Sequence, residues 1–172
     1  MFKTILVAID GSDAAHRALE TAIELASKHN ARLYVAHVHL HGRPAEELER
    51  LAEIEHIVPE VAANLAPSVD AKATHLRDLL LRAEHEAQVV SRMGDLILLR
   101  AKQQALTAGV AHVETYSATG DYADGILDAI DETGADLVVM GHRGLGRVKQ
   151  LLLGSVSNKV AQQAGAAVLI VQ

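Results

Sequence analysis

Five short runs rich in apolar residues, the third of them weaker than the others, limit the folds that this chain can adopt. They cover residues 3–9 (KTILVAI), 32–40 (RLYVAHVHL), 110–118 (VAHVETYSA), 137–140 (LVVM) and 167–171 (AVLIV). Runs that do not alternate between apolar and polar residues are typical of strands buried on both faces, as in a parallel sheet. The sequence therefore predicts a parallel sheet that is covered on both sides.

Helical patterns separate these runs. Ser12 is placed as an N-cap, and after it apolar residues recur at steps of three and four: Ala15, Ala18, Leu19, Ala22, Ile23 and Ala26. A second helix is predicted over Asp121–Thr133, with Gly134 as its left-handed cap, and a third is predicted to begin with Ser155 as its cap. Strands that alternate with helices predict one doubly wound α/β domain over residues 1–172.

The segment 42–93 is longer than one crossover requires, so we interpret it as a helical insertion between the second and third strands. A helix is expected over Glu46–Val58, and a long one from Leu76 to Ala108 that would bend at Gly94. The apolar or small positions of the long helix mostly alternate between steps of four and three. The insertion would be a hairpin packed on the domain or a dimer contact, with a solvated extension as the alternative.

Composition excludes several classes of protein. The chain has no cysteine, which excludes disulfides and thiolate metal sites. A net charge of -6, with one Phe, three Tyr and no Trp, argues against nucleic-acid binding. No apolar run approaches the roughly 18–20 residues of a membrane span, and the N-terminus lacks the regions of a secretion signal. We expect a cytoplasmic protein with no nucleic-acid or membrane partner.

A glycine-rich stretch, Met140–Ser157 (MGHRGLGRVKQLLLGSVS), joins the fourth apolar run to the last helix. Glycine permits positive φ and lets backbone approach a ligand closely, and the N–H groups that open a helix attract phosphate. Every Asp and Glu of the chain lies at or before Asp136, and the segment after it carries only Arg143, Arg147, Lys149 and Lys159 as charged residues. The stretch is predicted to bind a phosphate; a simple tight turn is the alternative.

The stretch matches neither of two common phosphate motifs. It has no Gly-Lys-Ser/Thr as in a Walker loop, and a dinucleotide fingerprint would follow the first strand, where this chain has DGS. Instead, Gly141-x2-Gly144-x9-Gly154-Ser155 resembles the signature of the ATP-binding branch of the universal stress protein family. ILVAIDGS (5–12) and GDYADGILDAIDETGADLVVMGHRG (120–144) are also similar to that family. The resemblance covers nearly the whole chain outside about residues 42–93.

The resemblance implies a five-stranded parallel sheet of order 3-2-1-4-5 with helices on both faces, Rossmann-like and similar to the adenine nucleotide alpha hydrolases. Ligands of such sheets bind beyond the C-terminal ends of the strands where the order reverses, here strands one and four. It further implies an adenine-nucleotide site at ten positions: Ala8, Asp10, Val38, Met140, Gly141, Arg143, Gly144, Gly154, Ser155 and Val156.

Within this implied site, Ala8 and Val38 would border the adenine, and Val38 would offer backbone hydrogen bonds. Asp10 would lie near the ribose or a Mg²⁺ held through the phosphates. The ribose and phosphates would be held by Gly141, Arg143 and Gly144, and by Gly154, Ser155 and Val156. Two prolines usual in the family are replaced, one by Tyr122 and one within Ala166–Ala167, and neither replacement is expected to touch the pocket.

The resemblance favours a stress-response regulator that binds ATP or another adenine nucleotide, with no hydrolysis or very slow hydrolysis. It also implies a homodimer through the last strand, which would otherwise be an unprotected edge: Val168, Leu169, Ile170 and Val171. One alternative is an ATPase or nucleotidyl-transfer enzyme, although no evident base accompanies Asp10. Another is a nucleotide-independent interaction module for an unknown protein partner, against which the intact glycines argue.

Two further patterns could carry chemistry. His37, His39 and His41 alternate along one strand, and three imidazoles at this spacing could bind a metal; histidines near a strand end that only pack there are the stronger interpretation. Asp10 follows the first strand, as the phospho-accepting aspartate of a receiver domain does. No lysine directly follows the fourth or fifth strand, so this interpretation is weak.

Overall fold

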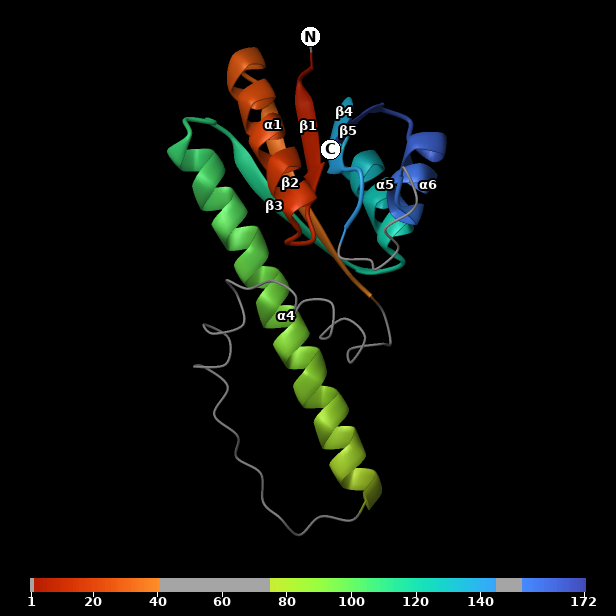
Figure 1. Ribbon diagram of the computed structural model, residues 1–172. Helices are drawn as coiled ribbons and strands as arrows, with labels where there is room; N and C mark the ends of the chain where they lie inside the picture. Colours follow the sequence, from red (N-terminus) through yellow and green to blue (C-terminus); the bar gives the residue numbers. More distant parts are fainter. Residues whose placement is uncertain (1, 41–74, 145–152) are drawn as a thin grey trace.

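Five parallel strands form one sheet in the computed structural model, which describes residues 2–40, 75–144 and 153–172. The strands are β1 (Thr4–Ala8), β2 (Arg32–Leu40), β3 (Val113–Gly120), β4 (Leu137–Gly141) and β5 (Ala167–Val171). All neighbouring pairs are parallel, and the order is β3-β2-β1-β4-β5 (Figure 1). The predicted fold class and strand order are confirmed.

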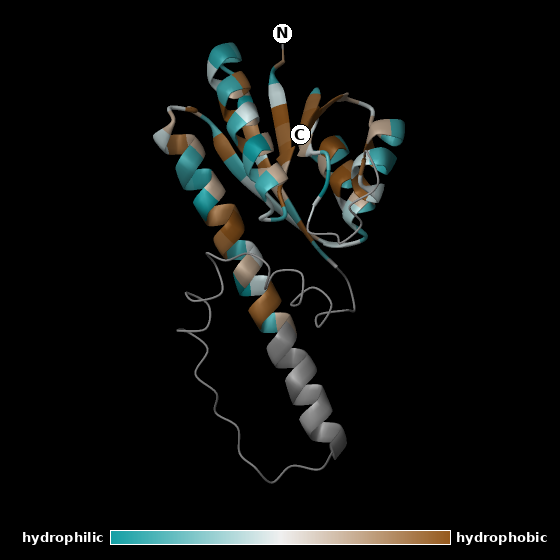
Figure 2. Ribbon diagram, in the orientation of Figure 1, coloured by the Kyte–Doolittle hydropathy of each residue, from teal (hydrophilic) through white to brown (hydrophobic). Residues whose placement is uncertain are grey.

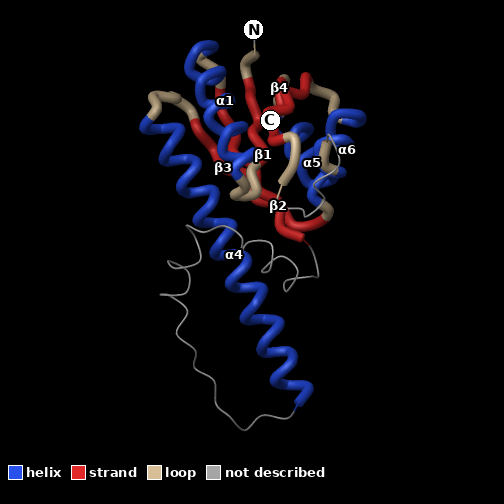
Figure 3. Tube along the Cα trace, viewed as in Figure 1, coloured by secondary structure: helices blue, strands red, loops and turns tan. Residues whose placement is uncertain are grey.

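Helices cover both faces of the sheet (Figure 3). Those that the structure describes are α1 (Asp13–His29), α4 (His75–Thr107), α5 (Tyr122–Thr133) and α6 (Ser155–Gln163). The core cluster that contains the buried residues of α1 and α4 lies on one face, and the cluster that contains those of α5 and α6 lies on the other. The sheet is therefore the middle layer of three.

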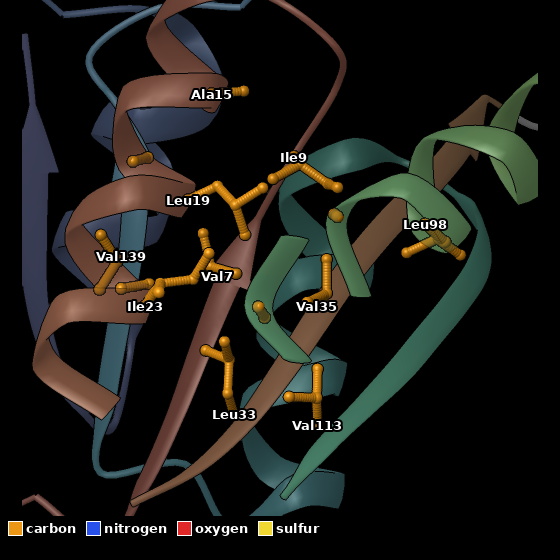
Figure 4. Packing of buried hydrophobic residues seen from close by; sticks show 14 of the residues in the cluster. Val7, Ile9, Ala15, Leu19, Ile23, Leu33, Val35, Leu98, Val113 and Val139 are labelled. Carbon is orange, nitrogen blue, oxygen red and sulfur yellow. The ribbon is translucent and has the colours of Figure 1, made fainter. Parts of the chain in front are cut away.

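Successive strand residues point to opposite faces, which explains the uninterrupted apolar runs. In β1, Val7 belongs to the cluster under α1 and α4, whereas Leu6 belongs to the cluster under α5 and α6. Figure 4 shows Val7, Val35 and other strand residues of the first cluster packed together with residues of α1 and α4. Figure 2 shows hydrophobic residues along β1 and on turns of α4. Because both faces of β1 and β4 are buried, both faces of these strands are apolar.

Ser12 caps the start of α1 and Gly134 caps the end of α5, as the sequence predicts, and Asp121, predicted as the first residue of α5, is its N-cap. The Ser12 hydroxyl accepts a hydrogen bond from the N–H of Ala15 at 3.2 Å. The Asp121 carboxylate accepts from the N–H groups of Ala123 and Asp124, and Gly134 ends α5 with a φ of 63°. These contacts satisfy backbone groups that have no partner inside their helix.

The predicted cap of the last helix is wrong by one residue. Gly154 is the N-cap of α6, with φ -68° and ψ 159°, and Ser155 is the first helical residue. No side chain caps this helix. The chain enters α6 in the extended conformation usual for an N-cap, and the N–H of Gly154 donates to the carbonyl of His142 at 2.8 Å.

Helix α4 is a single element of 33 residues, as the long helix was predicted to be, and it continues without interruption through Gly94. At 1.5 Å per residue it is about 50 Å long. Val90, Ile97, Ala101 and Ala105 are buried, whereas Ala87 is exposed. Figure 1 shows the first half of α4 extending beyond the sheet. Residues 42–74, including the helix expected over 46–58, lie outside the described residues, so the interpretation of 42–93 as an insertion stays a prediction.

Gly94 provides space for two histidines rather than a bend. A Cβ on Gly94 would lie 2.0 Å from Cε1 of His39 and 2.9 Å from Cδ2 of His37. The two buried rings meet edge to face, with centroids 4.6 Å apart, and Nδ1 of His37 lies 2.9 Å from the Ile9 carbonyl oxygen. Within the parts of the chain that the structure describes, no three His, Cys, Asp or Glu side chains form a metal-binding group; His41 lies outside them.

Gly94→Ala is expected to lower the free energy of unfolding by about 1 kcal/mol. Overpacking a buried site costs about 1–3 kcal/mol, and replacing a glycine inside a helix returns about 1 kcal/mol. Urea denaturation of the wild type and the variant measures the difference. In a His39→Ala background the added methyl group has more room, so the same substitution is expected to cost less or to stabilise. Equal effects in the two backgrounds would contradict this packing account.

Candidate functional site

A cavity of about 310 Å³ lies at the C-terminal ends of β1, β2 and β4. Its floor is a row of three residues, Ala36, Ala8 and Met140, which the register places side by side because Ala8 pairs with both of the others. All three belong to the cluster under α5 and α6. Two alanines in this row leave room above the sheet that larger side chains would fill.

The connections of the sheet explain why the cavity lies here. After β1 the chain continues into α1 on one face, and after β4 it continues into α6 on the other face. Because β1 and β4 are neighbours, the two connections diverge and leave a crevice between them. All ten sequence-predicted site residues line the cavity: Ala8, Asp10, Val38, Met140, Gly141, Arg143, Gly144, Gly154, Ser155 and Val156.

Asp10 connects the end of β1 to the segment that follows β4. One of its carboxylate oxygens, Oδ1, accepts a hydrogen bond from the N–H of Ser12 at 3.0 Å. The other, Oδ2, is so close to Gly144 that a Cβ there would lie 2.0 Å from it. The carboxylate is therefore oriented by backbone on one side and packed against backbone on the other.

Close packing, rather than backbone conformation, explains the first two glycines of the motif. Gly141, Gly144 and Gly154 are not among the glycines with positive φ, so the motif does not use the conformational freedom that glycine permits. A Cβ on Gly141 would lie 2.9 Å from the backbone carbon and from the Cβ of Ala14 in α1. Gly154 differs from the other two, because its nearest neighbours would be 3.5 Å away, an ordinary contact.

The start of α6 is held beside the end of β4 by two hydrogen bonds. The buried hydroxyl of Ser157 donates to the carbonyl of Gly141 at 2.9 Å, and the N–H of Gly154 donates to His142. The N–H of His142 in turn donates to the carbonyl of Val171 in β5 at 2.7 Å. The first N–H groups of α6 have no partner within the helix, and residues 154–157 all line the cavity.

Six lining residues were missed by the sequence analysis: Ile9, Ala15, Ala36, Tyr122, Ile126 and Ser157. The expectation that Tyr122 does not touch the pocket is wrong. It fails because α5 packs closely on β2, where a Cβ on Gly125 would lie 2.8 Å from Cγ1 of Val38. The signal available in the sequence was the four-residue spacing of Tyr122 and Ile126, which places both on one helix face.

Ion pairs join α5 to α6 beside the cavity. Nζ of Lys159 lies 2.6 Å from a carboxylate oxygen of Asp124 and 3.4 Å from one of Asp121. The N–H of Asp124 and the charge of Lys159 hold the pKa of Asp121 below its ordinary value, and the hydrogen bond with Asp124 raises the pKa of Lys159. These groups are largely exposed, so the pairs position the helices more than they stabilise the fold. Arg147 and Lys149 lie outside the described residues.

The cavity thus combines two chemical environments. Its floor and much of its wall are apolar, whereas Asp10, Arg143, Ser155 and Ser157 contribute polar groups. A ligand with an apolar part and an anionic part fits this combination, because the N–H groups of a helix start favour negative charge. The fold and the cavity define an α/β protein with a cavity at the switch point of its parallel sheet.

Comparison with known proteins identifies the family. The universal stress protein family matches residues 1–172. The chain is 36% identical over 177 residues to universal stress protein YxiE of Bacillus subtilis, covering 100% of both chains. It is 37% identical over 172 residues to a universal stress protein of Thermus aquaticus, again covering 100% of both. This chain belongs to the universal stress protein family.

Solved structures of the family share the fold. A universal stress protein in complex with cAMP is 28% identical and has a TM-score of 0.63, covering 99% of this chain and 97% of that one. UspA from Lactobacillus plantarum is 22% identical with a TM-score of 0.70 and the same two coverages, 99% and 97%. Across the described ranges, none of the helices is long and apolar enough to cross a membrane.

Gly144→Ala is expected to lower the free energy of unfolding by about 1–3 kcal/mol, because the methyl group would overlap the Asp10 carboxylate. Gly154→Ala, which has room, is expected to cost only the difference in capping preference, about 0.5–1 kcal/mol. Chemical denaturation of both variants provides the comparison. In an Asp10→Ala background, the loss caused by Gly144→Ala should shrink and the loss caused by Gly154→Ala should stay the same. If Asp10→Ala leaves the effect of Gly144→Ala unchanged, Asp10 and Gly144 are not in contact.

Proposed function

We propose that this protein is a cytoplasmic stress-response regulator of the ATP-binding branch of its family, and that it holds ATP or another adenine nucleotide in the cavity without turning it over, or very slowly. The observation that carries this proposal is the composition of the cavity. An apolar floor of three strand residues lies beside the start of a helix and a single oriented carboxylate. A volume of about 310 Å³ is at the lower end of the range for small-molecule sites.

The polar end of the cavity suits the phosphates. Free N–H groups at the start of α6 and the helix dipole attract anions, and Arg143 adds a positive charge. The segment 137–172 contains no Asp or Glu that would repel a polyphosphate. Glycine at position 154 keeps this end open, because no Cβ projects from the residue that precedes the helix.

Asp10 suits a Mg²⁺ that is held mainly through the phosphates. Magnesium is usually bound by one or two carboxylates together with phosphate oxygens and water, and Asp10 is the carboxylate that the described lining provides. Hydrolysis would further require a group that positions or deprotonates a water. Asp10 already accepts from Ser12 and packs against Gly144, which supports retention of the nucleotide over turnover.

The apolar end suits the base. Val38, on β2, lines the cavity on the same sheet face as the floor and would border the adenine with Ala8. The relative solved with cAMP, at 28% identity over 99% of this chain, supports a nucleotide as the ligand class. The number of phosphates and the stress that the protein answers are the parts of this proposal that rest on the family signature alone.

Equilibrium dialysis with labelled ATP and Mg²⁺ tests the proposal. The wild type should retain ATP, and Gly154→Val should weaken binding at least about tenfold, the equivalent of 1.4 kcal/mol, because the new side chain would project where the phosphates approach. Gly165→Val is the matched control, since a Cβ added at Gly165 would meet no atom within 4 Å and this residue lies away from the cavity. Equal retention by all three proteins, or none by the wild type, would refute the proposed function.

We also propose that the protein forms a homodimer through β5. This strand is at the edge of the sheet, and Leu169 has 36% of its surface exposed. An apolar edge strand exposes unpaired backbone groups that a second copy can satisfy. The cytoplasmic location and the identity of any other protein partner stay predictions from the sequence.

Sedimentation velocity at micromolar concentration should show a dimer. Leu169→Lys is expected to shift the protein to monomer, because a charge in the middle of a paired edge is costly to bury. Leu99→Lys, at a 49% exposed position on α4, is the matched control and should remain dimeric. A dimer that is disrupted by Leu99→Lys and not by Leu169→Lys would place the interface on α4, the alternative that the sequence left open.

A further inference from the structure

Among the described residues that line the cavity, Tyr122 is the one with an aromatic side chain. It is the first residue of α5, and Ile126, one turn later, lines the same cavity. The two residues therefore form one wall, which belongs to the helix layer that packs over the apolar floor. Tyr122 is half-buried and packs at the edge of that core cluster.

The turn that carries Tyr122 is fixed on both sides. Toward β2, Gly125 allows α5 to approach so closely that an added Cβ would lie 2.8 Å from Val38, itself a lining residue. Toward α6, Lys159 bridges Asp121 and Asp124, the residues that precede and follow this part of the turn. Asp121 also caps the helix through two backbone N–H groups. The backbone of Tyr122 is thus held between the apolar and the polar ends of the cavity.

We propose that Tyr122 is a specificity-determining residue of the site, whose ring contacts the base of the bound nucleotide. This inference rests on the proposed function and extends it to a residue outside the glycine signature. Aromatic rings pair favourably with nucleobases, and the loss of one such contact costs about 1–3 kcal/mol. Anions without a base would gain nothing from this wall, so Tyr122 would favour nucleotides over simple polyphosphates.

Affinity and fluorescence together test the assignment. In equilibrium dialysis, Tyr122→Phe keeps the ring and should bind ATP within about twofold of the wild type, whereas Tyr122→Leu should raise the Kd about 5- to 100-fold. Tyr34→Leu is the matched control, because Tyr34 packs against the same core cluster and does not line the cavity. Its Kd for ATP should equal that of the wild type.

Tyrosine fluorescence, the second measurement, reports contact between the Tyr122 ring and the nucleotide directly. The chain has three tyrosines and no tryptophan, so its intrinsic fluorescence comes from tyrosine alone. Saturating ATP should quench the emission of the wild type and of Tyr34→Leu, after correction against free tyrosine for light absorbed by ATP. In Tyr122→Leu the remaining tyrosines should show no ATP-dependent quenching.

The outcomes separate this inference from the proposed function. If the wild type retains no ATP, the proposed function fails and the inference fails with it. If the wild type retains ATP, equal Kd values for wild type and Tyr122→Leu overturn the inference alone. Quenching that persists in Tyr122→Leu also overturns it, as does a loss of affinity in Tyr122→Phe as large as that in Tyr122→Leu. Matching unfolding midpoints for the two leucine variants show that the comparison concerns the site rather than the fold.

Discussion

The reversal of strand order between β1 and β4 is the constraint on which the rest of this structure depends. Two neighbouring parallel strands send their connections to opposite faces, so no backbone can close the space beyond their ends. The register then decides what lies beneath that space: Ala8 pairs with Ala36 on one side and with Met140 on the other. A shift of one residue would turn these side chains to the opposite face of the sheet. The cavity is therefore a product of topology and register, together with the small side chains of Ala8 and Ala36 on its floor.

Glycine serves one physical purpose at several distant places in this fold. Gly144 admits the carboxylate of Asp10, Gly94 admits the ring of His39, and Gly125 admits the side chain of Val38. In each case a single methyl group would lie under 3.0 Å from its neighbour, closer than real side chains pack. The close approach fixes one segment against another: the chain after β4 against β1, α4 against β2, and α5 against β2. The missing Cβ of each glycine therefore allows two segments to pack in close contact, in agreement with the close packing of protein interiors.

Much of the architecture could be predicted from the sequence, because apolar periodicity and capping residues are local signals. The five predicted runs correspond to the five strands, and Ser12 and Gly134 cap their helices as predicted. The order of the strands was predicted only from the resemblance to the family, because strand pairing produces no local pattern in the sequence. The structure places all ten predicted site positions in the lining of one cavity. What failed depended on distances between elements: the approach of α5 to β2 that brings Tyr122 to the cavity, and the hydrogen bond that makes Gly154 rather than Ser155 the cap of α6.

The backbone of His142 links the start of α6 to the edge strand β5. Its carbonyl accepts from the residue that opens α6, and its N–H donates to the final residue of the edge strand. A ligand that shifted the start of α6 would therefore also affect the C-terminal end of β5, which these two hydrogen bonds tie to it. If ligand binding changes the affinity of β5 for a second copy of the chain, dimer formation through β5 changes the affinity for the ligand by the same factor.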